Sequence, residues 1–270
     1  MSGSANEGRA PKKKGRAADQ APAKGEAKGF LAYLRHRHDP LTSLLLTVPV
    51  FLVYHLGILL IDVRNGVDLV SGLTFALLHQ SLGAYIGVTL GYVAAIALAV
   101  FWLRKRGTIR PAEFLPVLGE ALILAIVMTF TVGWATQHLF QWLSVAPAAT
   151  TFAAQAGPPA LGPVEKLVMA AGAGFHEELV FRVGLFAGGT FVLHKVVRIG
   201  EWKAALVMGL LSSIVFSAIH YVGPFGDPFT LLSFTFRVLA GVYLALVYRF
   251  RGFAVAVYTH AFYDIIVFFL

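Results

Sequence analysis

Cysteine is absent from this chain, and charged residues are scarce. The absence of cysteine excludes disulfides, thiolate metal sites and a cysteine nucleophile. Only 13% of the 270 residues are charged, whereas an ordinary soluble domain has roughly 25%. Hydrophobic residues make up 57% of the chain and the mean hydropathy is +0.73. This composition argues against a soluble globular domain and indicates an integral membrane protein.

Long apolar runs account for most of the chain. Each is close to the ~20 residues that an α-helix needs to cross a hydrocarbon core of ~30 Å. The sequence therefore predicts an all-α, polytopic helical membrane protein with about seven transmembrane helices. We expect the spans at residues 41–61, 82–103, 120–143, 164–195, 204–221, 229–248 and 252–270. An eighth helix or a re-entrant segment within residues 62–81 is the alternative.

The N-terminal tail, residues 1–38, holds nine Lys or Arg and three acidic residues, so it carries most of the formal net charge of +8. Residues 1–29 have almost no large apolar side chain, which predicts disorder, and residues 30–38 suit a short basic interfacial helix. The tail lacks the apolar centre of a signal peptide. We expect it to contact anionic lipids rather than nucleic acid, and we expect a membrane domain at residues 39–270.

The loop cations indicate the orientation. They lie in the tail, in residues 104–110, in residues 195–203 and at Arg249 and Arg251, whereas the alternate connections contain Arg64 as their only cation. Because cytoplasmic loops carry an excess of Lys and Arg, seven spans place the N-terminus in the cytoplasm and the C-terminus outside. A bacterial inner membrane is the expected location.

One stretch sets ionisable residues inside an apolar run: Gly172-Ala-Gly-Phe-His-Glu-Glu-Leu-Val-Phe-Arg182. A charged side chain near the bilayer centre costs about 2.5–3.5 kcal/mol on insertion scales and usually marks function. Glu178 and Arg182 are four residues apart, which favours an ion pair on one helical face. Glu177 points about 100° away, so it can face a cavity and act as a general base. The alternative is an ion-pair network that only fixes the register of the helices.

Two further polar pairs follow on later spans. Phe216 and His220 are four residues apart, as are His260 and Asp264. Alone, an intramembrane histidine is more often a packed, hydrogen-bonded residue than a catalyst, although an aspartate can orient a histidine. In a helix bundle, intramembrane polar groups face the interior and one another. We therefore expect these four residues to share one cavity with the acidic stretch.

The three motifs in this order resemble those of the CPBP family, the CAAX proteases and bacteriocin-processing enzymes that are also called Abi proteins. The motifs are Glu177-Glu178-x-x-x-Arg182, Phe216-x-x-x-His220 and His260-x-x-x-Asp264. Each motif is weak alone, whereas three in order on membrane helices form a specific signal. The resemblance covers residues 164–270, the expected catalytic core, and it implies an intramembrane glutamic endopeptidase.

The resemblance also implies the catalytic roles. Glu177 would act with His220 to activate the hydrolytic water, and Glu178 with Arg182 would brace the site. The third motif would form the oxyanion hole through His260 and Asp264, where the family has asparagine or aspartate. An ionised aspartate cannot donate a hydrogen bond, so this residue would have to be protonated or would instead orient the histidine.

A zinc site is the alternative to metal-free glutamate chemistry. His176-Glu177 begins like the zinc-protease motif H-E-x-x-H, but Val180 stands where the second histidine should be. Other histidines and carboxylates could bind zinc, so a metalloprotease remains open although no cofactor is the expectation. The remaining histidines have no such partner pattern and are expected to be structural or interfacial: His55, His79, His138 and His176.

The predicted topology suggests how a substrate would enter. The motif residues overlap in the middle and outer half of the membrane, which predicts a cavity that opens on the extracytoplasmic side. Its rim would be the uncharged loop 144–163 and the turn 223–228. Arg237 on the sixth span would face the same cavity and meet a substrate carboxylate or a lipid phosphate.

The expected substrate is a membrane-embedded or lipid-anchored protein that is cut near its C-terminus, as in the myxosortase-type branch of the family. Two classes compete with the protease. One is a non-proteolytic immunity or scaffold protein that keeps the family fold, and the other is a transporter or proton relay, in which buried Glu, His and Asp are also expected. No inverted repeat supports transport.

Overall fold

The computed structural model describes residues 39–58, 60, 81–105, 107–143, 162–222 and 226–270. These residues form helices and contain no strand, which confirms the all-α prediction. The elements are α2 (Pro40–Gly57), α4 (Leu82–Leu103), η1 (Pro111–Glu113), α5 (Phe114–Trp142), α6 (Pro163–Gly172), η3 (Ala173–Gly188), α7 (Gly189–Phe191), η4 (Val192–Val196), α8 (Glu201–Ile219), α9 (Leu231–Arg251) and α10 (Phe253–Phe269).

Six helical segments of the described chain are long and apolar enough to cross a membrane, and α10 is a shorter apolar helix of 17 residues. They coincide with the seven expected spans. The third span begins at Pro111 rather than near residue 120, because proline suits the first turn of a helix, where its missing N–H is not needed. The tail 1–38, most of the segment 62–81 and loop 144–161 lie outside the described residues.

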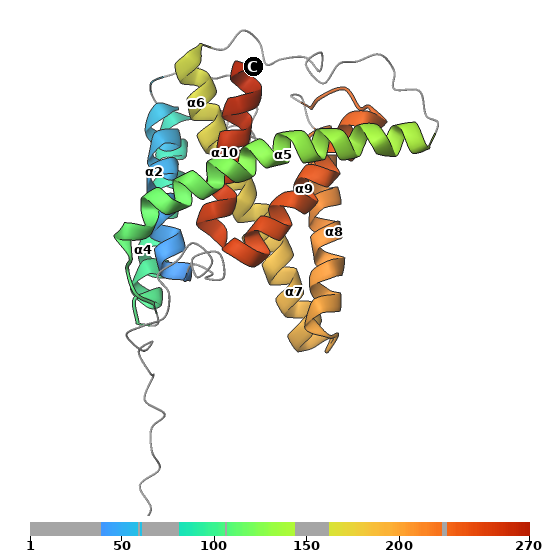
Figure 1. Cartoon of the computed structure of the whole chain (residues 1–270). Coiled ribbons are helices and arrows are strands. Elements are labelled where there is room, and N and C mark those ends of the chain that lie inside the picture. The colour runs from blue at the N-terminus through green and yellow to red at the C-terminus, as the bar shows by residue number, and fades with distance from the viewer. Residues whose placement is uncertain (1–38, 59, 61–80, 106, 144–161, 223–225) are drawn as a thin grey trace, which may run out of the picture. The chain divides into compact units, whose positions relative to one another are not determined.

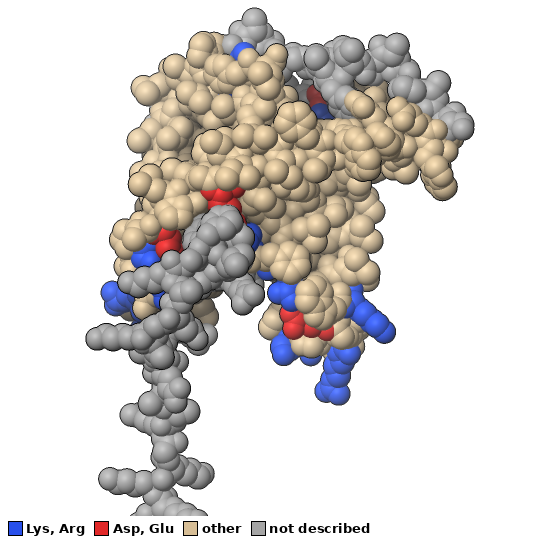
Figure 2. Space-filling view, viewed as in Figure 1, with Lys and Arg blue, Asp and Glu red and all other residues tan. Residues whose placement is uncertain are grey.

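The described surface is largely apolar, as expected for helices that face lipid. Phe130 is 72% exposed and Leu90 is 63% exposed. In Figure 2 most of the blue side chains lie towards the lower end of the molecule, and only small blue patches appear near its top. Exposed basic residues include Arg104 and Lys105 in the connection before α5 and Lys195 in η4, which precedes α8. The polar residues are thus sorted to an end or to the interior.

Helix α10 is the central element of the bundle, and it packs against α2, α5, α6, η3 and α9. All residues from Phe253 to Ala261 are buried. α5 crosses in front of it in Figure 1. Tyr258 ties α10 to α2 by donating a hydrogen bond of 2.8 Å to the carbonyl of Leu46. The motif residue His260 therefore stands on the most enclosed helix of the bundle.

Glycine permits a sharp reversal and a close helix contact in this core. Gly252 has φ 97° at the reversal between α9 and α10, a left-handed conformation that other residues rarely adopt. Gly174 faces α10, and a Cβ atom there would lie 2.8 Å from Ala261 Cβ and 2.9 Å from the Val257 carbonyl oxygen. Small residues are the usual means by which membrane helices approach closely. This contact holds η3 directly against α10.

The acidic stretch adopts a wider helix than the α-helix expected from its sequence. From Ala173 to Gly188 the backbone forms π-type turns, which continue α6 without a break. Such i→i+5 turns are rare and frequently occur at functional sites. Glu177, Glu178 and Arg182 all belong to this segment, which is therefore the irregular part of the span that carries them.

Candidate active site

Glu178 lies at the centre of the polar cluster and joins two helices. Its Oε2 lies 3.1 Å from Arg182 Nε, and its Oε1 lies 3.0 Å from Nδ1 of His260 on α10. Glu178 and Arg182 are both fully buried, with 0% exposure. The ion pair expected from their spacing is thus present. A single carboxylate links the first motif to the third.

Arg182 is held by charge and by an aromatic ring more than by aligned hydrogen bonds. Its guanidinium carbon lies 5.1 Å from the centroid of the Phe216 ring, a cation–π contact. None of its guanidinium nitrogens has a well-aligned hydrogen bond among the described residues, although Nε is close to Glu178. A buried charge without a partner is strongly destabilising. The carboxylate of Glu178 and the ring of Phe216 therefore offset the cost of burying the charge of Arg182.

His260 lies among three carboxylates. Its Nδ1 faces Glu178, and its Nε2 lies 3.8 Å from both Glu177 Oε2 and Asp264 Oδ2. An ionised carboxylate only accepts hydrogen bonds, so Nδ1 must carry the proton that is shared with Glu178. The other ring nitrogen is therefore directed towards the space between Glu177 and Asp264. Sequence spacing predicted the contact with Asp264 but not those with the glutamates.

Glu177 is 2% exposed, and the residue before it packs among aromatic rings. The preceding residue, His176, has its Nδ1 3.0 Å from the carbonyl of Gly172. The His176 ring lies 4.8 Å from the ring of Tyr54 and 5.2 Å from that of His55. His176 thus packs behind the site, which agrees with a structural part for it.

The second motif reaches the cluster through an aromatic ring. The Phe216 ring centroid lies 5.0 Å from that of His220 and 6.0 Å from that of His260. Nδ1 of His220 lies 2.7 Å from the Phe216 carbonyl and donates to it, so Nε2 carries the lone pair in the neutral ring. His220 follows the last residue of α8, Ile219.

Arg237 on α9 lies beside this second motif. It forms an ion pair with Asp227 and donates a hydrogen bond of 2.9 Å to the hydroxyl of Tyr221. The Tyr221 hydroxyl lies 2.6 Å from Ser233 Oγ. Sequence reasoning did not find Asp227 or Tyr221. The adjacency of Tyr221 to His220 was the available signal.

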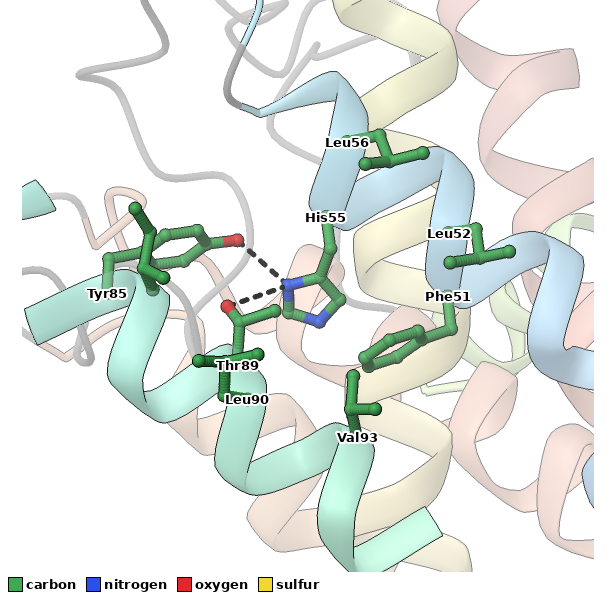
Figure 3. Close-up of a pocket in the computed structure, with 9 residues that line it drawn as sticks. Phe51, Leu52, His55, Leu56, Tyr85, Thr89, Leu90 and Val93 are labelled. Carbon is green, nitrogen blue, oxygen red and sulfur yellow. Dashed lines mark hydrogen bonds between the residues drawn. The ribbon is translucent and has the colours of Figure 1, made fainter. Parts of the chain in front are cut away.

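A pocket of about 190 Å³ lies between α2 and α4, and no motif residue lines it. Figure 3 shows that apolar side chains such as Leu52 and Val93 form most of its wall. His55 supplies a polar end, where its Nδ1 lies 2.9 Å from the Tyr85 hydroxyl and 3.4 Å from Thr89 Oγ1. His55 therefore has a local hydrogen-bonding partner set of its own, as a structural histidine does.

The described structure brings the predicted site residues into one region. Direct contacts join the first motif to the third, and ring contacts join both to the second. No group of three or more His, Asp or Glu side chains among the described residues is arranged to hold a metal ion.

Comparison with known proteins agrees with this geometry. Residues 159–266 match the family model described as Rce1-like, type II CAAX prenyl endopeptidase. This part of the chain is a CAAX protease (CPBP) family domain. The match covers less than half of the chain but includes every motif residue. No curated protein and no solved structure matches the chain. The CAAX protease domain is that of an intramembrane hydrolase, and the long apolar helices make the chain an integral membrane protein.

Proposed function

We propose that this CAAX-type protease is a glutamic endopeptidase that hydrolyses a peptide bond near the C-terminus of a membrane-anchored or lipidated protein. The observation that carries the proposal is the convergence of Glu177, Glu178 and His260. Two buried carboxylates from the first motif meet one imidazole from the third. That arrangement supplies a base, a bracing group and a donor position within one small space.

In this mechanism Glu177 and His220 activate the water. Glu177 takes a proton from the water as its oxygen attacks the carbonyl carbon, and a neutral His220 accepts a hydrogen bond from the same water through Nε2. The tetrahedral intermediate then collapses, the C–N bond breaks, and the proton held by Glu177 passes to the departing amine. Exclusion of bulk solvent from the site makes this proton transfer between the hydrolytic water and Glu177 effective.

His260 and Asp264 stabilise the oxyanion together. Because Nδ1 of His260 donates to Glu178, the ring can offer a second donor at Nε2 only when both nitrogens carry protons. An ionised Asp264 at 3.8 Å from Nε2 favours that charged ring. Asp264 thus acts on His260 rather than as a hydrogen-bond donor itself. Glu178 and Arg182 hold the ring in place.

The orientation follows from charge. The exposed cations of residues 104–110 and 195–203 are expected on the cytoplasmic side, which puts the C-terminus and the opening of the site on the extracytoplasmic side of a bacterial inner membrane. The basic tail would then reach anionic lipids of the cytoplasmic leaflet. Such access suits the C-terminal segment of a membrane-anchored or lipidated substrate, as in the myxosortase-type branch.

Cleavage of candidate membrane-anchored proteins in cells with and without the enzyme tests the function. Glu177→Gln and His220→Ala should each remove cleavage at a normal protein level. Glu165→Gln is the matched control, because Glu165 starts the same span and accepts a helix-capping hydrogen bond from the backbone N–H of Gly162. Cleavage that persists in Glu177→Gln would refute the mechanism.

A chelator and metal analysis test whether the proposed mechanism is free of metal. No step above passes through a metal, so a chelator should leave the cleavage rate unchanged and the purified active enzyme should contain no stoichiometric zinc. Loss of activity on chelation, with recovery on adding zinc, would replace Glu177-activated water by metal-bound water.

A further inference from the structure

A second polar group lies next to the motif residues and takes no part in the chemistry proposed above. It comprises Arg237 on α9 with Asp227 and Tyr221 from the connection that follows α8. Arg237 pairs with Asp227 and donates to the Tyr221 hydroxyl. Its guanidinium also lies over the Tyr221 ring, 5.2 Å from the centroid. Three contacts thus fix the position of this cation.

The connection around Asp227 is fastened to the second motif. The backbone N–H of Asp227 donates a hydrogen bond of 2.8 Å to the carbonyl of His220, and Tyr221 directly follows His220. Because Arg237 donates to the hydroxyl of Tyr221, the guanidinium lies beside the residue that follows the proposed water-activating histidine.

Arg237 differs from the other motif-region cation in its accessibility. Arg182 has no exposed side-chain surface and is bound to Glu178. In the Arg237 pair, the side chain of Arg237 is 21% exposed and that of Asp227 is 46% exposed. An ion pair this exposed contributes little to stability, so Asp227 can leave the guanidinium at small cost when another carboxylate takes its place.

We propose that Arg237 binds the C-terminal carboxylate of the substrate, and that Asp227 is the resident counterion that this carboxylate displaces. The inference rests on the proposed function, since it requires a scissile bond a few residues from a free C-terminus. Extended peptide spans ~3.3–3.6 Å per residue, so two or three residues reach from the motif residues to a neighbouring group. A guanidinium binds a carboxylate through two parallel hydrogen bonds. Arg237 would thereby select substrates by the position of their chain end.

Two peptides test this role. Both carry a prenylated cysteine in a CAAX sequence, and one ends in a free carboxylate while the other ends in an amide. Their affinities are measured by fluorescence anisotropy with the full-length protein in lipid nanodiscs, in a Glu177→Gln background that leaves the peptides intact. A charge-assisted contact of this kind should favour the free acid by about 10- to 100-fold.

The variants separate recognition from structure. Arg237→Gln should abolish the preference for the acid and leave binding of the amide unchanged, whereas Asp227→Asn should tighten binding of the acid alone. Arg249→Gln is the matched control, because Arg249 on the same helix forms a comparable exposed pair with Glu201, at 2.7 Å. It should keep the full preference.

Several results would overturn the assignment. They are equal affinity for the acid and the amide in the background protein, a preference that survives Arg237→Gln, an equal loss of both peptides in that variant, and no binding of either peptide. Failure of the proposed function appears separately, as absence of cleavage of the acid peptide by the unmodified enzyme, and it leaves the comparison of affinities valid.

Discussion

Replacing Gly174 by alanine tests whether close helix packing sets the geometry of the site. The added Cβ would lie 2.9 Å from the Val257 carbonyl oxygen and 3.0 Å from the backbone nitrogen of Ala261. These are backbone atoms, so no side-chain rotation can relieve the overlap and α10 must move away from η3. Ala261 adjoins His260, whose ring must stay within 3.0 Å of Glu178.

The magnitude follows from two opposed effects. An alanine in place of glycine favours a helix by about 0.5–1 kcal/mol, whereas overpacking a close contact costs about 1–3 kcal/mol. Gly184→Ala is the matched control on the same segment, because its Cβ would meet its nearest neighbour at an ordinary 3.6 Å. Gly174→Ala should therefore be less stable than Gly184→Ala by about 1–3 kcal/mol, the cost of the overlap itself.

Activity should respond more strongly than stability. A displacement of 1 Å at a catalytic group can cost about 10²-fold in rate. Restoring an ordinary contact of 3.4 Å at the Val257 carbonyl, in place of 2.9 Å, moves α10 from η3 by 3.4 − 2.9 = 0.5 Å. Thermal unfolding of the purified proteins in detergent and the rate of substrate cleavage are the two measurements. Wild-type cleavage by Gly174→Ala, or equal behaviour of the two glycine variants, would refute the claim that this contact positions His260.

Two further predictions concern charge. Arg182→Gln removes the cation from the buried Glu178 and should lower the folded yield, since breaking a buried pair costs about 3–5 kcal/mol. Adding Glu178→Gln should restore the yield but not cleavage. A normal yield of the Arg182→Gln protein would contradict the importance of the pair. The chain has no cysteine, so single introduced cysteines report the orientation of the helices in the membrane. An impermeant maleimide should label Leu270→Cys in intact cells and Lys203→Cys only after permeabilisation. The reverse pattern would overturn the proposed orientation.

The fold was largely predictable because the membrane imposes a strong constraint on sequence. Every span must satisfy its own backbone hydrogen bonds, so long apolar runs identify helices without knowledge of their packing. The predicted start of the third span near residue 120 was wrong, because the first turn from Pro111 is polar and resembles a loop in hydropathy. The π-type turns of η3 could not be predicted, since no local residue pattern distinguishes i→i+5 from i→i+4 bonding.

The site was predictable only where it is local in sequence. The spacing of four residues brought Glu178 to Arg182 in the wider helix as it would in an α-helix. The contact of Glu178 with His260 could not be read from the chain, because it depends on how α10 packs against η3. Asp227 was missed for the same reason, as its pairing with Arg237 depends on how a connection folds over the end of α8.

The glycines that precede the acidic residues therefore belong to the functional stretch. Gly174 stands one turn before Glu178 and touches α10 beside His260. Because Gly174 has no side chain, the two helices approach closely enough for the imidazole of His260 to share a proton with the carboxylate of Glu178. A larger residue would keep all the charged groups but separate them. The chemistry then depends on two properties of one segment: carboxylates that are costly to bury, and a surface small enough to bring their partner within reach. A substitution of the carboxylates or of Gly174 should impair cleavage, but only a loss of folding caused by an unpaired buried charge should be rescued by neutralising its partner.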